Sequence, residues 1–280
     1  MSHLELPNTI VADVINASKA PHSQRIIAIS NQKGGVGKTT TAVNLATAIA
    51  AVDKKVLVID MDPQGNASTS LGIDQKQRAV NTYHVLVGDA PLASAIVPTA
   101  VPGLSVVPSG VDLAAAELEL IDIEERHARL RNALTEGAKD FDYILIDCPP
   151  SLGLLTLNAL VAAHAVMVPL QAEFLALEGI SHLAKTIERI RKTFNPTLEL
   201  QGIVLTMVDT RNKLSEMVES DVRGYYGTKV YKTTIPRNVR ISEAPSYGKP
   251  VLLYDFGSKG ARAYLDLAGE VLKREQGVAA

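Results

Sequence analysis

Cysteine, tryptophan and long apolar runs are scarce or missing in this sequence of 280 residues. It holds one cysteine, Cys148, and no tryptophan, and aromatic residues make up 4% of it. One cysteine excludes a disulfide within the chain and an all-cysteine metal cluster built by one chain, and it fits a reducing cytosol. No 18 consecutive residues are apolar, so we expect no membrane span, and the start lacks the basic and apolar stretches of a secretory signal. These absences favour a cytoplasmic protein.

A large excess of charge of one sign is also missing, because the formal net charge is −2 at pH 7. This value argues against a wholly basic nucleic-acid binder. The charges are nevertheless uneven: residues 181–262 hold 14 Lys and Arg against 8 Asp and Glu, and the rest of the chain holds 14 against 22. Such a split can mark a face that binds a polyanion. Taken alone, the count fits a scatter of solvated surface lysines better.

Short apolar runs, rich in Ala, Val, Leu and Ile, alternate with longer segments of helical period. Strands that alternate with helices of ten or more residues predict an α/β fold, a doubly wound, mostly parallel sheet flanked by helices. Residues 25–280 are expected to form one domain, after a flexible N-terminal extension at 1–24 that shows no clear period. Strands are predicted at 26–30, 55–60, 104–108, 143–147, 165–169, 200–208 and 230–235, and helices at 39–52, 112–137 (as two helices), 154–163, 175–194, 214–226 and 258–274.

A glycine-rich loop of the kind that binds phosphate lies between the first predicted strand and the first predicted helix. Backbone N–H groups at a helix start lack partners within the helix, and the helix dipole adds partial positive charge there. Glycine lets the backbone approach phosphate oxygens closely. Lys38 is placed to neutralise the β- and γ-phosphates, and the Thr39 hydroxyl to ligate Mg²⁺. The loop comprises Gln32, Lys33, Gly34, Gly35, Val36, Gly37, Lys38, Thr39 and Thr40.

The loop departs from the common phosphate-loop pattern, which is Gly, four residues and then Gly-Lys-Ser/Thr. Gln32 stands where that pattern has its first glycine, and a second lysine, Lys33, comes five residues before Lys38. Lys-Gly-Gly-x-Gly-Lys-Thr-Thr is the deviant Walker A signature, which is far more specific than a lone glycine motif. A glycine-rich turn without a ligand is disfavoured, because strand, loop and helix all fall where the motif needs them.

Two further segments place carboxylates at the carboxyl ends of predicted strands, where parallel sheets bind their ligands. The second strand ends in Asp60, with Asp62 two residues later, and the strand at 143–147 ends in Asp147, the Walker B arrangement. A carboxylate of the first segment can enter the Mg²⁺ shell or orient a water for in-line attack. For Asp60 a second role stays open, since it can simply cap the neighbouring loop. Cys148 is expected to be a small buried residue.

These motifs resemble the ParA/MinD group of deviant Walker A ATPases, and within it the chromosomal ParA (Soj) proteins. The resemblance runs from about Arg25 to about Leu272 and implies the phosphate-loop NTPase fold. It also implies a slow hydrolysis of ATP to ADP and phosphate that a partner protein stimulates. The most specific matching segments are Lys33–Thr41, Asp60–Asn66, Ile146–Pro150 and Ile235–Pro245.

The resemblance implies an active site that a second chain completes. ATP would drive a face-to-face homodimer in which Lys33 reaches the partner's phosphates, as an arginine finger does, while Lys38 binds those of its own nucleotide. Thr39 would ligate Mg²⁺, Asp62 would orient the attacking water and lie in the metal shell, and Asp147 would support that shell through water. Catalysis is thus assigned to Lys33, Lys38 and Asp62. The implied nucleotide-binding residues are Lys33, Gly34, Gly35, Val36, Gly37, Lys38, Thr39, Thr40, Met207, Pro236 and Asn238, of which Pro236 and Asn238 lie near the adenine.

The resemblance also changes the interpretation of the uneven charge, because Arg211 and Arg240 align with family positions that bind DNA. Binding built on a few phosphate contacts is sensitive to salt and indifferent to sequence. Dimerisation doubles the basic patch and so couples ATP to DNA. A ParB-like centromere-binding partner would stimulate hydrolysis and release the dimer from the nucleoid, which moves replicated origins apart. Weaker DNA-binding candidates are Lys213, Arg223, Lys249, Lys259 and Arg262.

Relatives of this group suggest alternatives. A MinD-like spatial regulator of division or polar positioning, whose nucleotide state recruits partners, is the main one. Its membrane cycle needs a C-terminal amphipathic helix, and residues 272–280 show no apolar face, so no membrane contact is expected. A nitrogenase-iron-protein-like role needs two cysteine ligands per chain. The helix-turn-helix domain of many plasmid ParA proteins does not fit into 24 residues. A metabolic kinase or synthetase is disfavoured, because no substrate domain or lid insertion is visible.

Overall fold

The computed structural model describes residues 24–173, 176–209 and 211–276. The predicted extension at 1–24 therefore lies outside the described residues except for Gln24, and so does the tail 277–280. Gln24 leads into the first strand and donates side-chain hydrogen bonds to the carbonyls of Ala138 (2.5 Å) and Phe141 (3.1 Å). Within the described ranges, no helix combines the length and the apolar character needed to cross a bilayer.

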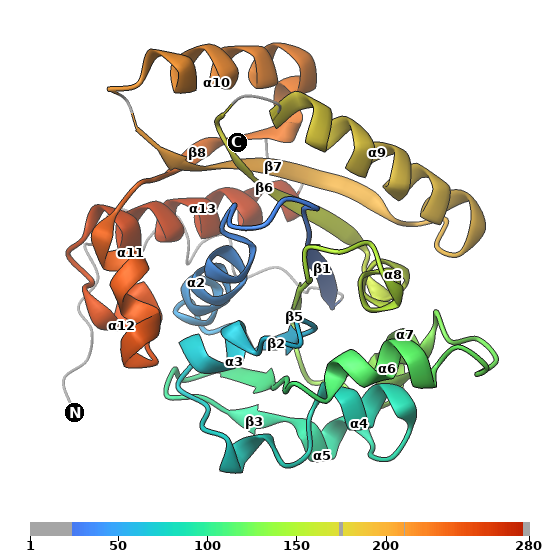
Figure 1. Cartoon of the computed structure of the whole chain (residues 1–280). Helices are drawn as coiled ribbons and strands as arrows, with labels where there is room; N and C mark the ends of the chain where they lie inside the picture. Colours follow the sequence, from blue (N-terminus) through green and yellow to red (C-terminus); the bar gives the residue numbers. More distant parts are fainter. Residues whose placement is uncertain (1–23, 174–175, 210, 277–280) are drawn as a thin grey trace.

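One eight-stranded sheet runs through the described chain in the order β3-β4-β2-β5-β1-β6-β7-β8 (Figure 1). Its neighbouring strands are parallel, apart from the two-residue edge strand β3, which pairs antiparallel with β4. This order confirms the predicted mostly parallel α/β sheet. The strands are β1 (Arg25–Ile29), β2 (Val56–Asp60), β3 (Val97–Pro98), β4 (Leu104–Val107), β5 (Tyr143–Asp147), β6 (Ala165–Gln171), β7 (Glu199–Val208) and β8 (Val230–Pro236).

Helices cover both faces of the sheet, because successive side chains of a strand point to opposite faces. From β1, Ile27 and Ile29 enter the core that α2 and α13 cover, while Ile26 and Ala28 enter the core beneath α8 and α9. Figure 1 shows α2 and α8 on opposite sides of β1. The helices are α2 (Lys38–Ala50), α3 (Asn66–Ser70), α4 (Thr82–Val87), α5 (Leu92–Ala95), α6 (Leu113–Glu119), α7 (Arg129–Gly137), α8 (Leu154–Ala162), α9 (Ala176–Thr193), α10 (Lys213–Tyr226), α11 (Val239–Glu243), α12 (Val251–Tyr254) and α13 (Lys259–Glu275).

Each predicted strand and each predicted helix is present, with bounds within two residues of the prediction. The helical segment at 112–137 is two helices, α6 and α7, as expected. The prediction missed β3, α3, α4, α5, α11 and α12, which have six residues or fewer. Such elements are too short for a hydrophobic period to show in the sequence.

Side chains close the outer edge of the sheet at β8. The Glu270 carboxylate on α13 accepts the backbone N–H groups of Lys232 and Thr233, both at 2.9 Å. Arg223 on α10 donates to the carbonyl of Tyr231 (2.9 Å) and pairs with Glu219. An edge strand whose polar backbone groups are occupied does not recruit another strand. Arg223, a weaker DNA-binding candidate in the sequence, therefore stabilises the edge strand β8.

Candidate functional site

The glycine-rich loop lies at the carboxyl end of β1, near the centre of the sheet (Figure 1). From β1 the chain crosses through α2 to β2 on one side, and β6 lies on the other side of β1. Such a reversal of direction opens a crevice at the carboxyl ends of the strands, which is where open α/β sheets bind their ligands. The sheet order thus places the loop at the ligand-binding edge.

Two glycines of the loop have backbone angles that other residues rarely adopt: φ is +75° at Gly35 and +88° at Gly37. A Cβ atom added at Gly34 or Gly35 would meet nothing within 4 Å, so the outer face of the loop is open to a ligand. Gly37 is the N-cap of α2, and its carbonyl accepts the Thr41 N–H (2.9 Å). The N–H groups just before Thr41 therefore have no acceptor within the helix and are available to an anion.

Two side-chain hydrogen bonds tie the loop to the distant strands β6 and β7. The Asn31 amide donates to the carbonyl of Pro169 on β6 (2.8 Å), and its oxygen accepts the Lys33 N–H (3.0 Å). The Thr206 hydroxyl on β7 donates to the carbonyl of Val36 (2.8 Å). Sequence reasoning missed both anchors. The one available signal was that β6 and β7 end beside the loop in a parallel sheet.

The two lysines of the loop differ in environment. Lys38 is 7% exposed and donates to the carbonyl of Lys33 (3.0 Å). Burial lowers the pKa of Lys38, and the carboxylates of Asp147 and Asp62 oppose that shift. The Lys33 side chain is 56% exposed and ion-paired with Glu173, just beyond β6, a partner that the sequence did not indicate. Lys38 thus belongs to the interior of the site and Lys33 to its mouth.

Asp60 and Asp62 are two residues apart but have separate roles. The Asp60 carboxylate is fully buried and accepts the N–H (2.9 Å) and the hydroxyl (2.7 Å) of Ser68 together with the Asp62 N–H (3.2 Å). Burial raises the pKa of Asp60 to about 6, and the Ser68 hydrogen bonds limit the rise. Asp60 therefore caps the neighbouring loop, the second of the two roles left open by the sequence. Asp62 is partly exposed and accepts the N–H of Gln64 (3.0 Å).

Asp147 ends β5 beside Asp60, its partner in the parallel ladder. Its carboxylate is fully buried, and within the described part of the chain neither oxygen has a hydrogen-bond partner. Burial and the neighbouring Asp60 raise the pKa of Asp147 far above its usual range, while Thr39 and Lys38 favour the charged form. A buried polar atom without a partner is rare unless a ligand or water satisfies it. Asp147 and Thr39 fit Mg²⁺, which binds to proteins through few oxygen ligands and keeps several waters.

The orphaned carboxylate leads to a prediction about stability. Asp147→Asn is expected to raise the Tm of the nucleotide-free protein at pH 7 by roughly 3–10 °C, because a carboxyl whose charged form is disfavoured by burial is replaced by a neutral group of the same size. The folded-state pKa is raised, so the carboxylate destabilises the fold as pH rises above the unfolded value of about 3.9, and the difference in Tm should shrink toward pH 4. Thermal melts with and without Mg²⁺ and ATP would measure this. An unchanged or lower Tm at pH 7 would contradict it, and stabilisation by Mg²⁺ and ATP should be weaker in the variant.

Cys148 follows Asp147 and is buried. Burial raises the pKa of its thiol. A thiol that stays protonated and buried is a poor nucleophile and metal ligand. The expectation of a small buried residue is confirmed.

The other predicted nucleotide-binding residues, Met207, Pro236 and Asn238, lie at or just after the adjacent ends of β7 and β8. Met207 has a positive φ of +53°, and its methyl carbon lies 4.0 Å from where a Cβ on Gly37 would stand. Val208 pairs with Pro236 across the ladder. Asn238 is the N-cap of α11 and accepts the Arg240 N–H (2.9 Å). Their contacts with a nucleotide stay a prediction.

Arg211 lies on the loop that follows β7, and Arg240 lies on α11 just after β8, at the edge of the sheet that carries the phosphate loop. Their side chains are 87% and 52% exposed. Arg211 binds both oxygens of Asp209 at 2.9 and 2.8 Å, and Arg240 pairs with Glu243 (2.9 Å) and Asp255 (3.2 Å). The structure thus brings together, on one edge, two cations that are 29 residues apart in the sequence.

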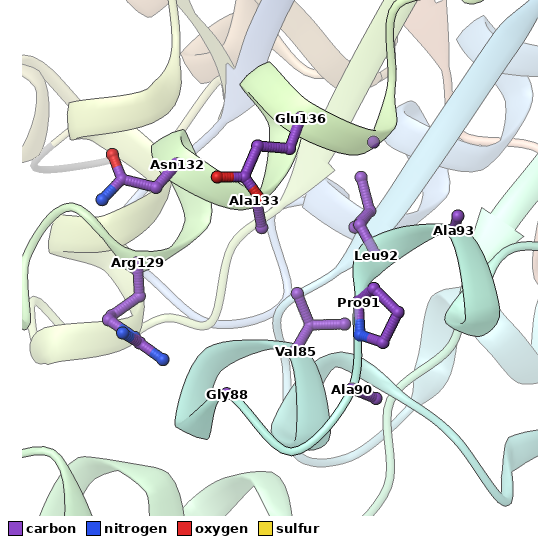
Figure 2. A pocket seen from close by; sticks show the side chains of 11 residues that line it. Val85, Gly88, Ala90, Pro91, Leu92, Ala93, Arg129, Asn132, Ala133 and Glu136 are labelled. Atoms are coloured by element: carbon purple, nitrogen blue, oxygen red, sulfur yellow. The ribbon is translucent and has the colours of Figure 1, made fainter.

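Two hollows lie near this site, and Pro236, a predicted nucleotide-binding residue, lines the second. One, of about 470 Å³, separates α4 and α5 from α7; Figure 2 shows Val85, Leu92 and Ala133 lining it, with Arg129 to one side. No residue of the phosphate loop lines it. The other, of about 700 Å³, lies between β8 and the start of α13, and three of its lining residues are basic: Lys232, Lys259 and Arg262. The described residues contain no group of three or more His, Cys, Asp or Glu side chains placed to hold a metal ion.

A parallel sheet whose central strand leads through a lysine-bearing glycine loop into a helix defines a phosphate-loop NTPase. A family model described as an AAA domain matches residues 24–200. The chain is 58% identical over 254 residues to the chromosome partitioning protein ParA of Caulobacter vibrioides (strain NA1000 / CB15N). The aligned residues cover 90% of this chain and 95% of that protein. It is 52% identical over 247 residues to the sporulation initiation inhibitor protein Soj of Bacillus subtilis (strain 168), with 88% and 98% covered.

A solved structure shares the fold. A cobyrinic acid a,c-diamide synthase from Mycobacterium smegmatis, solved with an ATP analogue and magnesium bound, is similar with a TM-score of 0.80 and 39% identity, over 91% of this chain and 96% of that chain. The chain belongs to the ParA/Soj family of chromosome-partitioning ATPases.

Proposed function

We propose that this protein is an ATP-dependent dimerising switch for chromosome partition, built as one ATPase domain over residues 25–280. The observation that carries the proposal is the contrast between the two lysines of the loop. Lys38 is buried beneath the loop, where it reaches its own nucleotide, while Lys33 is exposed at the mouth. A cation at the mouth can neutralise phosphates held by a second chain, as an arginine finger does. The site is therefore complete only in a homodimer.

Within each chain the residues divide the work of ATP hydrolysis. The open N–H groups of the loop and the Lys38 ammonium hold the phosphates, and Thr39, Asp147 and Asp62 hold Mg²⁺, in the case of Asp147 through water. When bound, Mg²⁺ neutralises charge on the phosphate oxygens. Ser68 donates hydrogen bonds to Asp60 but not to Asp62. Asp62 therefore orients the attacking water. Pro236 and Asn238 lie near the adenine, and Met207 contacts the nucleotide. A ParB-like centromere-binding partner accelerates this slow turnover.

The ATP dimer binds DNA without sequence preference and so associates with the nucleoid in the cytoplasm. Arg211 and Arg240 make the main phosphate contacts, and the basic hollow at Lys259 and Arg262 extends their surface. Dimerisation joins two such surfaces, and the second then binds at high effective concentration. Hydrolysis separates the chains, and each monomer leaves the DNA.

A DNA-binding titration with ADP, ATP and a slowly hydrolysed analogue, repeated at several salt concentrations, tests the proposal. We expect binding with ATP that ignores sequence and falls steeply with salt, because phosphate contacts release counterions. Arg211→Glu and Arg240→Glu should keep ATP binding and weaken DNA binding at least about tenfold. Arg191→Glu is the matched control, since Arg191 is 50% exposed and pairs with a glutamate three residues away, as Arg240 does.

Three results would contradict the proposal. Equal DNA binding with ADP and ATP would show that the nucleotide does not control DNA binding. DNA binding that persists in both arginine variants would show that Arg211 and Arg240 do not form the DNA-binding surface. Binding of the ATP form to anionic lipid vesicles in place of DNA would favour a MinD-like spatial regulator.

A further inference from the structure

We propose that the carboxyl end of β7, residues Thr206–Asp209, carries the nucleotide state of the phosphate loop to both DNA-binding arginines, with Thr206 as the positioning residue that senses it. The inference rests on the proposed function, because such a link has a role only where ATP controls DNA binding. Four observations support it, in order along the link.

The link begins at a buried hydrogen bond between residues 170 positions apart. The Thr206 hydroxyl, on a residue that is 2% exposed, donates to the Val36 carbonyl at 2.8 Å. That carbonyl and the Gly37 N–H belong to one planar peptide unit. A phosphate that accepts the Gly37 N–H therefore acts on one end of this rigid plane. The Thr206 hydroxyl acts on the other end. Any rotation of that plane on nucleotide binding is transmitted directly to β7.

The second observation is the backbone of the next residue. Met207 has φ +53°, a left-handed conformation that disfavours side chains other than glycine. Such a conformation persists only where the surroundings impose it, and it is typical of segments that switch. The surroundings here include the loop itself, because a Cβ on Gly37 would lie 3.8 Å from Thr206 and 4.0 Å from Met207. The strained residue is thus packed against the part of the loop that meets phosphate.

Third, the first DNA-binding arginine is attached to the end of this segment. Asp209 accepts the Arg211 backbone N–H at 3.1 Å and two guanidinium N–H groups at 2.9 and 2.8 Å. Three hydrogen bonds to one carboxylate fix the direction of the Arg211 side chain relative to Asp209. A movement of β7 at Met207 therefore reorients Arg211.

Fourth, the second arginine is attached to the same segment through β8. The Arg237 N–H donates to the Val208 carbonyl at 3.1 Å, and Val208 pairs with Pro236. Asn238 then caps α11 by accepting the N–H of Arg240. Val208 and Asp209 are adjacent, and they thus hold the segment that leads into α11 with Arg240 and the loop that carries Arg211. One displacement at the end of β7 reaches both.

Thr206→Val tests the link, because it removes the hydroxyl and keeps a branched side chain of similar size. The measured quantity is the ratio of DNA affinity with the slowly hydrolysed ATP analogue to that with ADP. With nucleotide in saturating excess, we expect this ratio to fall at least about fivefold, the lower end of typical coupling between sites.

Thr47→Val is the matched control. Thr47 is also 2% exposed, and its hydroxyl also donates to a backbone carbonyl at 2.8 Å, but that carbonyl belongs to Val43 of the same helix, and Thr47 lies near the far end of α2. The ratio of DNA affinity with the ATP analogue to that with ADP should be the same in Thr47→Val as in wild type. The inference is overturned if Thr206→Val keeps the full ratio, or if it loses ATP affinity in parallel with DNA affinity, which would make Thr206 a simple anchor of the loop. Failure of the proposed function is distinguishable, because it appears in the wild-type titration as binding that ignores the nucleotide.

Discussion

Lys38→Ala should abolish ATP binding and leave the fold intact. The ammonium of Lys38 is buried beneath the loop, donates to the Lys33 carbonyl and lies in the field of Asp147 and Asp62. Without it, bound phosphates would face these carboxylates with no compensating cation. Truncating one partner of a buried charge pair costs about 2–5 kcal/mol, so we expect a loss of affinity between about thirtyfold and about four-thousandfold. Isothermal titration calorimetry with ATP and Mg²⁺ measures this.

Lys33→Ala is the control for this prediction, because Lys33 belongs to the same loop but is exposed. It should bind ATP as a monomer with near-normal affinity, yet fail to dimerise in size-exclusion chromatography with the slowly hydrolysed analogue. Tight ATP binding by Lys38→Ala would show that the loop is not the phosphate site. Normal dimerisation of Lys33→Ala would show that no lysine crosses between the chains.

Asp62→Ala has the second largest expected effect, on turnover instead of binding. The variant should bind ATP, dimerise and remain on DNA, while hydrolysis falls by about a hundredfold or more, because the water loses the carboxylate that orients it. Single-turnover hydrolysis and the lifetime of the protein on DNA are the two measurements. Both should change together, since release from DNA requires hydrolysis.

The neighbouring carboxylate provides the matched control for Asp62. Asp60→Asn should affect the fold more than the chemistry, because Asp60 is buried and accepts two hydrogen bonds from Ser68 and one from Asp62. We expect a lower Tm, with hydrolysis per folded molecule reduced much less than in Asp62→Ala. Normal hydrolysis by Asp62→Ala would reassign the water-orienting role to another group, and a selective loss in Asp60→Asn would point to Asp60.

The sequence alone determined the class of fold and the phosphate loop, because both depend on residues that are near neighbours in the chain. A buried strand such as β1, the loop after it and α2 form one continuous segment, and each carries its own local pattern. Short helices such as α3 and α11 were not predicted, because a segment of five residues is too short to show a helical period of hydrophobic residues.

Only the tertiary structure decided which groups of similar chemistry do which work. Asp60 and Asp62 look alike in the sequence, and the packing of Ser68 against Asp60 separates them. The pairing of Lys33 with Glu173, the unsatisfied carboxylate of Asp147 and the bond from Thr206 to Val36 arise when strands far apart in the chain end at one edge of the sheet. A hydrogen bond depends on distance and direction in space, and local patterns in a sequence carry neither across 170 residues.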